Sequence, residues 1–405
     1  ILFGLILLSF YHPAFILFGI LLVVILGTIL YYTGARGLST SIEESTQKYS
    51  LAAWLEEMAR GVKAFKFEPD GPVLTQNSEQ RTIRYLDKRT QHFRVLLFQY
   101  RILVFFKTTI TAAMLLVGSI LLLDQQLNIG QFIAAEIVIL IVIAAVEKLI
   151  GNLDSVYDVL TSVDKMAKLT EKPEELSGRL PMPWRKEGIT IELQQLRFGF
   201  HPEQKILEDV NGRIPSGGKA CITGPDGSGK STLLQLMGGI YTDFEGGLLY
   251  DGIPIANYQI DTLRAQIGIS LSGQHIFQGS VWENVTMGRT DITIEELMEW
   301  TVALRFDKQL QEWPLGWDTP LSPLGSHLSG STIRKILLLR AMAKKPRLLL
   351  LEEPWRGCGE ADRKAIQDLL LHLPDSITVV VVTSDADFVA RCPIRIELNP
   401  ASTNA

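Results

Sequence analysis

The chain has 405 residues, enough for two or three domains, and its 39 basic and 44 acidic residues leave a net charge of −5. This charge gives no indication of nucleic acid as a partner, so we expect none. The three cysteines, Cys221, Cys358 and Cys392, are scattered along the sequence, which is typical of a reducing compartment and does not favour a disulfide framework or a metal cluster.

Long apolar runs in the first 150 residues predict membrane helices; they cover residues 2–10, 15–31, 105–123 and 129–150. The last three approach or reach the roughly 20 residues that span a bilayer. These runs are not expected to be a signal peptide, because no basic segment stands ahead of them, and Ile1 is expected to lie inside a membrane helix that the sequence enters part-way.

The distribution of basic residues predicts the orientation of these helices. Ten Lys and Arg residues lie between Thr33 and Val95, whereas the turns at 9–14 and 124–128 contain none. Because cytoplasmic loops are enriched in Lys and Arg, the long segment and the soluble part after residue 165 are expected in the cytoplasm. The sequence therefore predicts a multi-pass protein of the plasma or inner membrane.

The cytoplasmic segment has a helical pattern with one break. Its apolar residues recur at alternating steps of four and three, at Leu51, Leu55, Met58, Val62 and Phe65. Pro69, Gly71 and Pro72 interrupt the pattern before a second helical stretch. Two helices that meet at a short link could act as a mechanical lever or form a hairpin without a mechanical role.

Four charged residues lie in or near the last two spans. Lys107, Glu147 and Lys148 are expected at the inner boundary, where long side chains reach the interface. The matched depth of Lys107 and Glu147 permits an ion pair. Glu136 is expected about 12 Å into the hydrocarbon, where an unpaired carboxylate is costly. It should either line a substrate cavity or be protonated and packed.

The second half of the chain contains a phosphate-binding loop of the form G-x4-G-K-[ST]. It follows an apolar run that ends at 221–223 and precedes the helical pattern of 233–237, the strand–loop–helix setting that this motif requires. Glycines let backbone N–H groups curl around phosphates, Lys230 neutralises their charge and Ser231 can hold Mg²⁺. The motif predicts nucleoside triphosphate binding by nine residues: Gly224, Pro225, Asp226, Gly227, Ser228, Gly229, Lys230, Ser231 and Thr232.

Two carboxylates follow a predicted buried strand. Residues 348–351 are four leucines, typical of a strand buried on both faces of a parallel sheet, and Glu352 and Glu353 come directly after them. Ligands bind at this end of the strands in open α/β sheets. One acid can hold Mg²⁺ through water, and the other can position or activate an attacking water.

Together these features resemble half of an ATP-binding cassette (ABC) exporter. The resemblance extends over almost the whole chain, at residues 62–65, 129–132, 250–255, 263–264, 276–284, 316–320, 328–332 and 340–341. It implies an α-helical transmembrane domain of the type I exporter kind, joined to an α/β P-loop NTPase domain with a β-subdomain and a helical subdomain. The first two membrane helices and part of the third are expected ahead of Ile1.

The resemblance also implies the domain boundaries. The transmembrane domain covers residues 1–165, a linker covers 166–187, and the nucleotide-binding domain covers 188–400. Within the first, residues 33–100 form a cytoplasmic extension with a coupling helix near Lys66–Leu74.

The same resemblance assigns roles to single residues. Phe200 matches the aromatic side chain that stacks on adenine, and Glu353 matches the catalytic carboxylate. Ser329, Gly330 and Ser331 lie in the signature motif, which contacts the ATP held by a second half-transporter. Two such chains would close head-to-tail around two ATP molecules and switch the membrane cavity.

Several positions depart from the family pattern. Ser272 occupies the position of the glutamine-loop glutamine, Gly359 that of the D-loop aspartate, and Ser384 that of the switch histidine. Glu352 replaces the aspartate that serves Mg²⁺, and the signature ends in Ser-Thr instead of Gly-Gln. The binding residues are kept, whereas hydrolysis loses contacts whose removal commonly lowers rates ~10²–10³-fold.

The sequence therefore predicts the weakly hydrolysing half of a heterodimeric ABC exporter that uses ATP and Mg²⁺. Against this stands the altered signature, since the weak half of such a pair usually lends a good signature to its partner. A homodimeric exporter of ordinary activity and a non-transporting, ATP-sensing membrane regulator are the alternatives. The membrane segments look closest to bacterial peptide- or protein-secretion exporters, which indicates that class of cargo without naming one.

Overall fold

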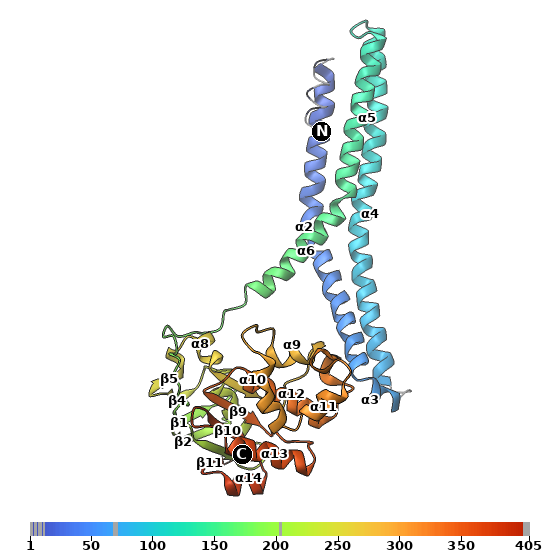
Figure 1. Cartoon of the computed structure of the whole chain (residues 1–405). Helices are drawn as coiled ribbons and strands as arrows, with labels where there is room; N and C mark the ends of the chain where they lie inside the picture. Colours follow the sequence, from blue (N-terminus) through green and yellow to red (C-terminus); the bar gives the residue numbers. More distant parts are fainter. Residues whose placement is uncertain are drawn as a thin grey trace. The chain divides into compact units, whose positions relative to one another are not determined.

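The computed structural model describes residues 3, 6, 10, 13–67, 72–201 and 205–399. The chain divides into two compact units, residues 1–173 and residues 174–405 (Figure 1). Helix α6 (Leu153–Thr170) extends into the start of the segment predicted as a linker, whose bounds stay a prediction. An ion pair between Lys168 and Asp164, one helical turn apart at 2.6 Å, supports its last turn.

The first unit consists of helices: α2 (Pro13–Arg60), α3 (Val62–Phe67), α4 (Pro72–Leu123), α5 (Ile129–Gly151) and α6. Helix α2 packs along α4, α5 packs against α4, and α6 packs against α2. In the described part of the chain, three helices are long and apolar enough to cross a membrane. The predicted spans 15–31, 105–123 and 129–150 are confirmed as helix, whereas most of the run at 2–10 lies outside the described residues.

The cytoplasmic extension is helical, and its buried face contains part of the predicted seam. Leu51, Met58 and Phe65 are half-buried, whereas Leu55 and Val62 are 52% and 45% exposed. Trp54, which the seam did not include, is 8% exposed. The Trp54 indole Nε1 donates to Ser78 Oγ on α4 at 2.9 Å, because a buried indole N–H needs an acceptor. The contact is therefore centred on Trp54. Pro69 and Gly71 lie outside the described residues, as does part of the predicted coupling helix.

Polar side chains hold α2, α4 and α6 together. The buried amide of Gln99 on α4 donates to Thr33 Oγ1 on α2 at 2.7 Å and to the Tyr157 hydroxyl on α6 at 3.0 Å. His92 on α4 makes the same type of bridge, with Nδ1 2.9 Å from Thr40 Oγ1 and Nε2 3.2 Å from Asp154 Oδ1. Buried polar groups of this kind fix one register between helices.

The charged side chains in the predicted spans have different surroundings. Lys107 Nζ lies 2.8 Å from Glu147 Oε2, so the two residues form the ion pair that their matched depth permits. Glu136 is half-buried on α5. Helix α5 begins with a capping box between Asn128 and Gln131, which places Glu136 about two turns from the helix start. A role for Glu136 in the substrate path stays a prediction.

The second unit contains two larger sheets. The antiparallel sheet has the order β2 (Leu207–Ile214), β1 (Ile191–Phe198), β4 (Glu245–Tyr250), β5 (Ile253–Pro254). The parallel sheet has the order β11 (Ile394–Glu397), β3 (Lys219–Thr223), β10 (Thr378–Val382), β9 (Leu348–Glu352), β6 (Ile267–Ser270). A short ladder joins β7 (Gly279–Ser280) and β8 (Pro320–Leu321).

Helices surround these sheets. They are α7 (Lys230–Met237), α8 (Ile260–Ala265), α9 (Val281–Thr286), α10 (Ile294–Ala303), α11 (Asp307–Glu312), α12 (Gly330–Ala343), α13 (Glu360–Leu371) and α14 (Ala386–Arg391), with 3₁₀ turns at Ile255–Asn257, Gly316–Asp318 and Pro323–Gly325.

The four leucines of β9 explain how the two cores are built. Leu348 and Leu350 belong to the core shared with the antiparallel sheet, and Leu349 and Leu351 belong to the core on the opposite face. All four are fully buried, as the sequence predicts for a central parallel strand. Successive side chains of this one strand therefore pack into the two cores on opposite faces of the sheet.

Arg347, just before β9, ties distant segments together. Its side chain is 2% exposed, and Nη2 pairs with Asp251 Oδ2 at 2.8 Å. Nε donates to the Glu187 carbonyl at 2.6 Å, and Nη1 donates to Gln266 Oε1 at 3.0 Å. A guanidinium this deeply buried is stable only because each side is paired or hydrogen-bonded.

Candidate nucleotide-binding site

The topology of the parallel sheet brings the predicted site residues together. Strands β3, β10, β9 and β6 are neighbours, and their carboxyl ends lie at one edge. The phosphate loop follows β3, Ser384 follows β10, Glu353 follows β9 and Ser272 follows β6. This edge is where open α/β sheets bind ligands.

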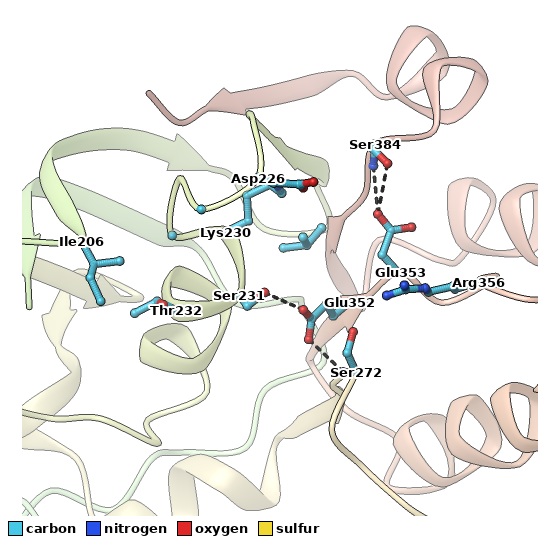
Figure 2. A pocket seen from close by; sticks show the side chains of 13 residues that line it. Ile206, Asp226, Lys230, Ser231, Thr232, Ser272, Glu352, Glu353, Arg356 and Ser384 are labelled. Atoms are coloured by element: carbon cyan, nitrogen blue, oxygen red, sulfur yellow. Dashed lines mark hydrogen bonds and ion pairs between the residues drawn. The ribbon is translucent and has the colours of Figure 1, made fainter. Parts of the chain in front are cut away.

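A cleft of about 830 Å³ opens at this edge (Figure 2). Its lining combines the loop, both carboxylates and two of the altered positions: Ile206, Asp226, Gly227, Gly229, Lys230, Ser231, Thr232, Ser272, Glu352, Glu353, Arg356, Val382 and Ser384. The volume is in the range that holds a small organic ligand. Ile206 and Arg356 are the lining residues that bear no motif signal in the sequence.

The loop has the backbone shape that holds phosphate. Gly227 and Gly229 have φ values of 80° and 84°, in the left-handed region that other residues rarely adopt. Gly229 is also the N-cap of α7, so the first N–H groups of that helix face the loop without a side-chain cap. Within the loop, the buried Ser228 hydroxyl has no hydrogen-bond partner among the described residues. Donors are thus available to an anion.

Lys230 is held by the loop. Its Nζ donates to the carbonyls of Gly224 and Pro225 at 2.7 and 2.8 Å and lies 3.8 Å from Asp226 Oδ1. The Lys230 side chain is 14% exposed, so its charge is aimed into the loop. A phosphate entering the cradle would exchange these carbonyl contacts for stronger charge-assisted ones.

Glu352 bridges the loop and the segment after β6. Its Oε1 accepts from Ser231 Oγ at 2.5 Å, and its Oε2 accepts from the Ser272 backbone N–H at 2.8 Å (Figure 2). A hydroxyl and a carboxylate at one point are hard oxygen donors of the type that Mg²⁺ prefers. The residues present therefore fit a Mg²⁺ ion. The Ser272 side chain itself makes none of these contacts.

Glu353 is turned toward the segment after β10. Its Oε1 accepts from the backbone N–H of Ser384 at 3.0 Å and from the Ser384 hydroxyl at 3.5 Å. Its Oε2 accepts from Thr383 Oγ1 at 3.2 Å. The backbone at Glu353 has φ 41°, an unusual conformation for glutamate that the surrounding structure must impose. The structure thus places Ser384 directly against the predicted catalytic carboxylate.

Phe200 lies outside the lining of this cleft. It is 53% exposed and forms an edge-to-face cluster with Phe198 and Tyr241, at ring distances of 5.2 and 5.4 Å. The ring of Phe200 is therefore accessible to a ligand. Its stacking on adenine stays a prediction.

Comparison with known proteins identifies the domain that holds the cleft. The family model described as ABC transporter matches residues 207–356, which contain the phosphate loop and both carboxylates. This part of the chain is an ABC transporter domain. The solved structure of a bacterial Atm1-family ABC exporter with ATP bound superposes with a TM-score of 0.84 at 17% identity, over 95% of this chain and 68% of that one. The type I exporter fold is therefore confirmed.

Two curated relatives define the extent of the similarity. The mitochondrial iron-sulfur clusters transporter ATM1 of Saccharomyces cerevisiae is 32% identical over 211 residues, which is 52% of this chain and 29% of that protein. The uncharacterized ABC transporter ATP-binding protein YwjA of Bacillus subtilis is 26% identical over 275 residues, which is 67% of this chain and 48% of that protein. The matches thus span less than half the length of either relative.

The chain joins helices that can cross a membrane to an ABC transporter domain. Its apolar helices make it a multi-pass membrane protein, and the basic residues between its spans place the ATP-binding domain in the cytoplasm.

The signature segment of this ABC protein is stabilised within its own domain. Ser329 is the N-cap of α12, and its Oγ accepts from the Thr332 N–H at 3.1 Å. Ser331 Oγ donates to Asp362 Oδ2 on α13 at 2.9 Å. Gly330 has open space where a side chain would begin. These contacts leave the backbone of Gly330 accessible.

Gly359 begins α13 without a side-chain cap, in a conformation (φ −66°, ψ 163°) that any residue can adopt. Open space surrounds it, so the absence of an aspartate there is not a steric necessity.

Proposed function

We propose that this chain is an ATP-binding subunit of a dimeric ABC exporter that binds ATP well and hydrolyses it slowly. The observation that carries the proposal is the arrangement around Glu353. A carboxylate able to position water is present, but the neighbouring side chain is the neutral Ser384, and both oxygens of Glu353 are held by the segment after β10. Nothing at Ser384 can supply positive charge as the γ-phosphate leaves.

Binding would use the parts of the cleft that are intact. The phosphates would lie against the backbone N–H groups of the loop and the N-terminus of α7, with Lys230 exchanging its carbonyl partners for phosphate oxygens. Ser231 and Glu352 would hold Mg²⁺, which neutralises charge on the phosphates. Phe200 would offer an aromatic face to adenine.

Hydrolysis would depend on how Glu353 is oriented. Thr383 and Ser384 both hold its carboxylate toward the segment after β10, and its remaining lone pairs would have to align a water with the γ-phosphate. Loss of a single preorganised electrostatic contact commonly lowers a rate ~10²–10³-fold. Slow turnover follows from both features together.

A heterodimer accounts best for the altered residues. Ser272, Gly359 and Ser384 affect the ATP site of this chain, and Ser331 affects the signature that it offers to a partner. A partner chain with complete motifs would supply the main hydrolytic activity, while closure around both nucleotides would switch the membrane cavity. A homodimer would carry every one of these changes twice.

The cargo follows only from the membrane half. A peptide or protein is the class that the membrane segments favour, and the half-buried Glu136 on α5 is the side chain that we expect to line its path. The yeast relative is named an iron-sulfur clusters transporter, but the match covers 29% of that protein, so its cargo is not assigned to this chain.

The test is ATP turnover by the full chain in lipid nanodiscs, alone and with candidate partner half-transporters, beside Glu353→Gln. We expect turnover near background for the chain alone and a rise with the right partner. Normal exporter turnover by the chain alone, abolished by Glu353→Gln, would show a homodimeric exporter. ATP binding without nucleotide-dependent transport in vesicles, with any partner, would favour the regulatory alternative.

A further inference from the structure

We propose that Arg356 is a second cationic contact for the terminal phosphate of bound ATP. This inference rests on the proposed function, because it assigns a further residue to the same nucleotide site. It adds a residue that no sequence motif marks.

The turn after β9 fixes where Arg356 begins. The Arg356 N–H donates to the Glu353 carbonyl at 3.0 Å, and the following Gly357 has φ 81°, which completes a tight turn. Trp355 fixes this turn by packing into the core. It is 5% exposed, and its ring centroid lies 4.8 Å from that of Phe388. The backbone of Arg356 is therefore held beside the catalytic carboxylate.

The side chain of Arg356 faces the cleft. It is one of the lining residues, and Figure 2 shows its guanidinium beside Glu353. Both carboxylate oxygens of Glu353 accept from the segment after β10, from Thr383 and Ser384. Within the described part of the chain, the Arg356 side chain has no ion-pair or hydrogen-bond partner, so its donors are available to a ligand.

The charged residues that line the cleft favour a second cationic contact for the phosphates. Lys230 and Arg356 are the lining residues with positive charge, and they face the carboxylates of Asp226, Glu352 and Glu353. Lys230 is already directed at the loop carbonyls, where the inner phosphates would lie. An incoming polyphosphate would meet unbalanced negative charge near Glu353 unless Arg356 offsets it. A guanidinium stays protonated and matches phosphate oxygens with its fork of donors.

The position of Arg356 distinguishes one phosphate from another. It lies on the Glu353 side of the cleft, whereas the loop that cradles the inner phosphates is formed by residues after β3. ATP places its third phosphate toward Glu353, and ADP has none. Arg356 should therefore increase the preference of the site for ATP over ADP and leave ADP binding almost unchanged.

The test compares the dissociation constants of ATP and ADP, with Mg²⁺, for the full chain in nanodiscs. We expect Arg356→Ala to weaken ATP binding about 10-fold or more, the scale of a charge-assisted contact, with ADP binding changed less than about twofold. Arg356→Lys should recover part of the ATP affinity. Arg213→Ala, which removes the same charge from an exposed site on β2, should change neither constant.

Three outcomes would overturn the inference. Equal weakening of ATP and ADP would mean a general structural effect, which a lowered unfolding temperature would accompany. Unchanged constants would exclude contact with the nucleotide. An unchanged ATP to ADP ratio with lost nucleotide-dependent association would place Arg356 against a partner subunit instead. If the unaltered chain binds no ATP, the proposed function itself fails.

Discussion

Glu352 holds two partners at once. Its Oε1 accepts from the Ser231 hydroxyl and its Oε2 accepts from the backbone N–H of Ser272, so one carboxylate connects the phosphate loop with the segment that follows β6. At the next position, Glu353 is bound to the opposite segment. The two adjacent carboxylates thus face different partners, which suits different roles.

The identity of residue 384 gives the first prediction. Ser384→His should raise the turnover of the full chain, by up to ~10²-fold, because an imidazole beside Glu353 adds an electrostatic contact to the γ-phosphate. The backbone N–H of residue 384 would continue to hold Glu353. Steady-state ATPase assays would measure the effect, with the Ser384→His/Glu353→Gln double variant as control. Unchanged turnover would place the defect at Ser272, Gly359 or the signature.

Arg347 gives a prediction of stability. Arg347→Ala leaves Asp251 buried, at 11% exposure, without its cation, and breaking a buried pair in this way commonly costs about 3–5 kcal/mol. The free energy of unfolding of the cytoplasmic domain, followed by urea denaturation of the full chain, should fall by that order. Arg395→Ala, at an exposed site, should change it little. Equal effects of the two substitutions would contradict the assigned role of the pair.

At the scale of elements, α13 lacks a cap that its geometry permits. Gly359 occupies the N-cap with φ −66° and open space around it, so an aspartate could accept the first N–H groups of the helix. Gly359→Asp should stabilise the cytoplasmic domain by about 1 kcal/mol, from the cap and the reduced freedom of the unfolded chain. Gly359→Ala gains the second part but puts a poor N-cap at the helix start, so it should be less stable than Gly359→Asp by about 1 kcal/mol. Thermal unfolding that does not distinguish Asp from Ala would rule out capping.

The contact between α12 and α13 gives a prediction of pH dependence. Burial alone would raise the pKa of Asp362, but hydrogen bonds from Lys335 and Ser331, with the positive charge of Arg305, outweigh it and lower the pKa below the usual 3.8. Because the folded domain favours the ionised form, this stabilisation is present above about pH 3.8 and is lost as the pH falls through the lowered pKa.

Ser331→Ala removes one of these hydrogen bonds, so it should move acid unfolding to a higher pH. The midpoint of acid unfolding, followed by tryptophan fluorescence, would measure the change. Ser326→Ala, an exposed serine in the same segment, should leave the midpoint where it is. A shift of equal size in both variants would show that the Ser331–Asp362 bond is not responsible.

For the whole molecule, the sequence predicts those features whose residues are contiguous in the chain, and it misses those whose residues are far apart. The phosphate loop and the leucine strand are contiguous and carry their own chemistry, so fold and ATP site were predictable. Gln99 and Tyr157 are 58 positions apart, and nothing local indicates that they meet. Trp54 joins the half-buried members of the predicted seam because packing against α4, and not periodicity alone, selects the buried face. Arg356 belongs to no motif, and only the turn after β9 brings it to the cleft.

We propose that the whole molecule binds ATP without hydrolysing it quickly, and one measurement tests this separation of binding from hydrolysis directly. Full chain in nanodiscs is incubated with Mg²⁺ and radiolabelled ATP, separated from free nucleotide and quenched, and the bound nucleotide is identified. We expect most of the bound label to be still ATP after a time in which an active exporter would have turned over many times. Bound nucleotide that is mostly ADP would contradict it.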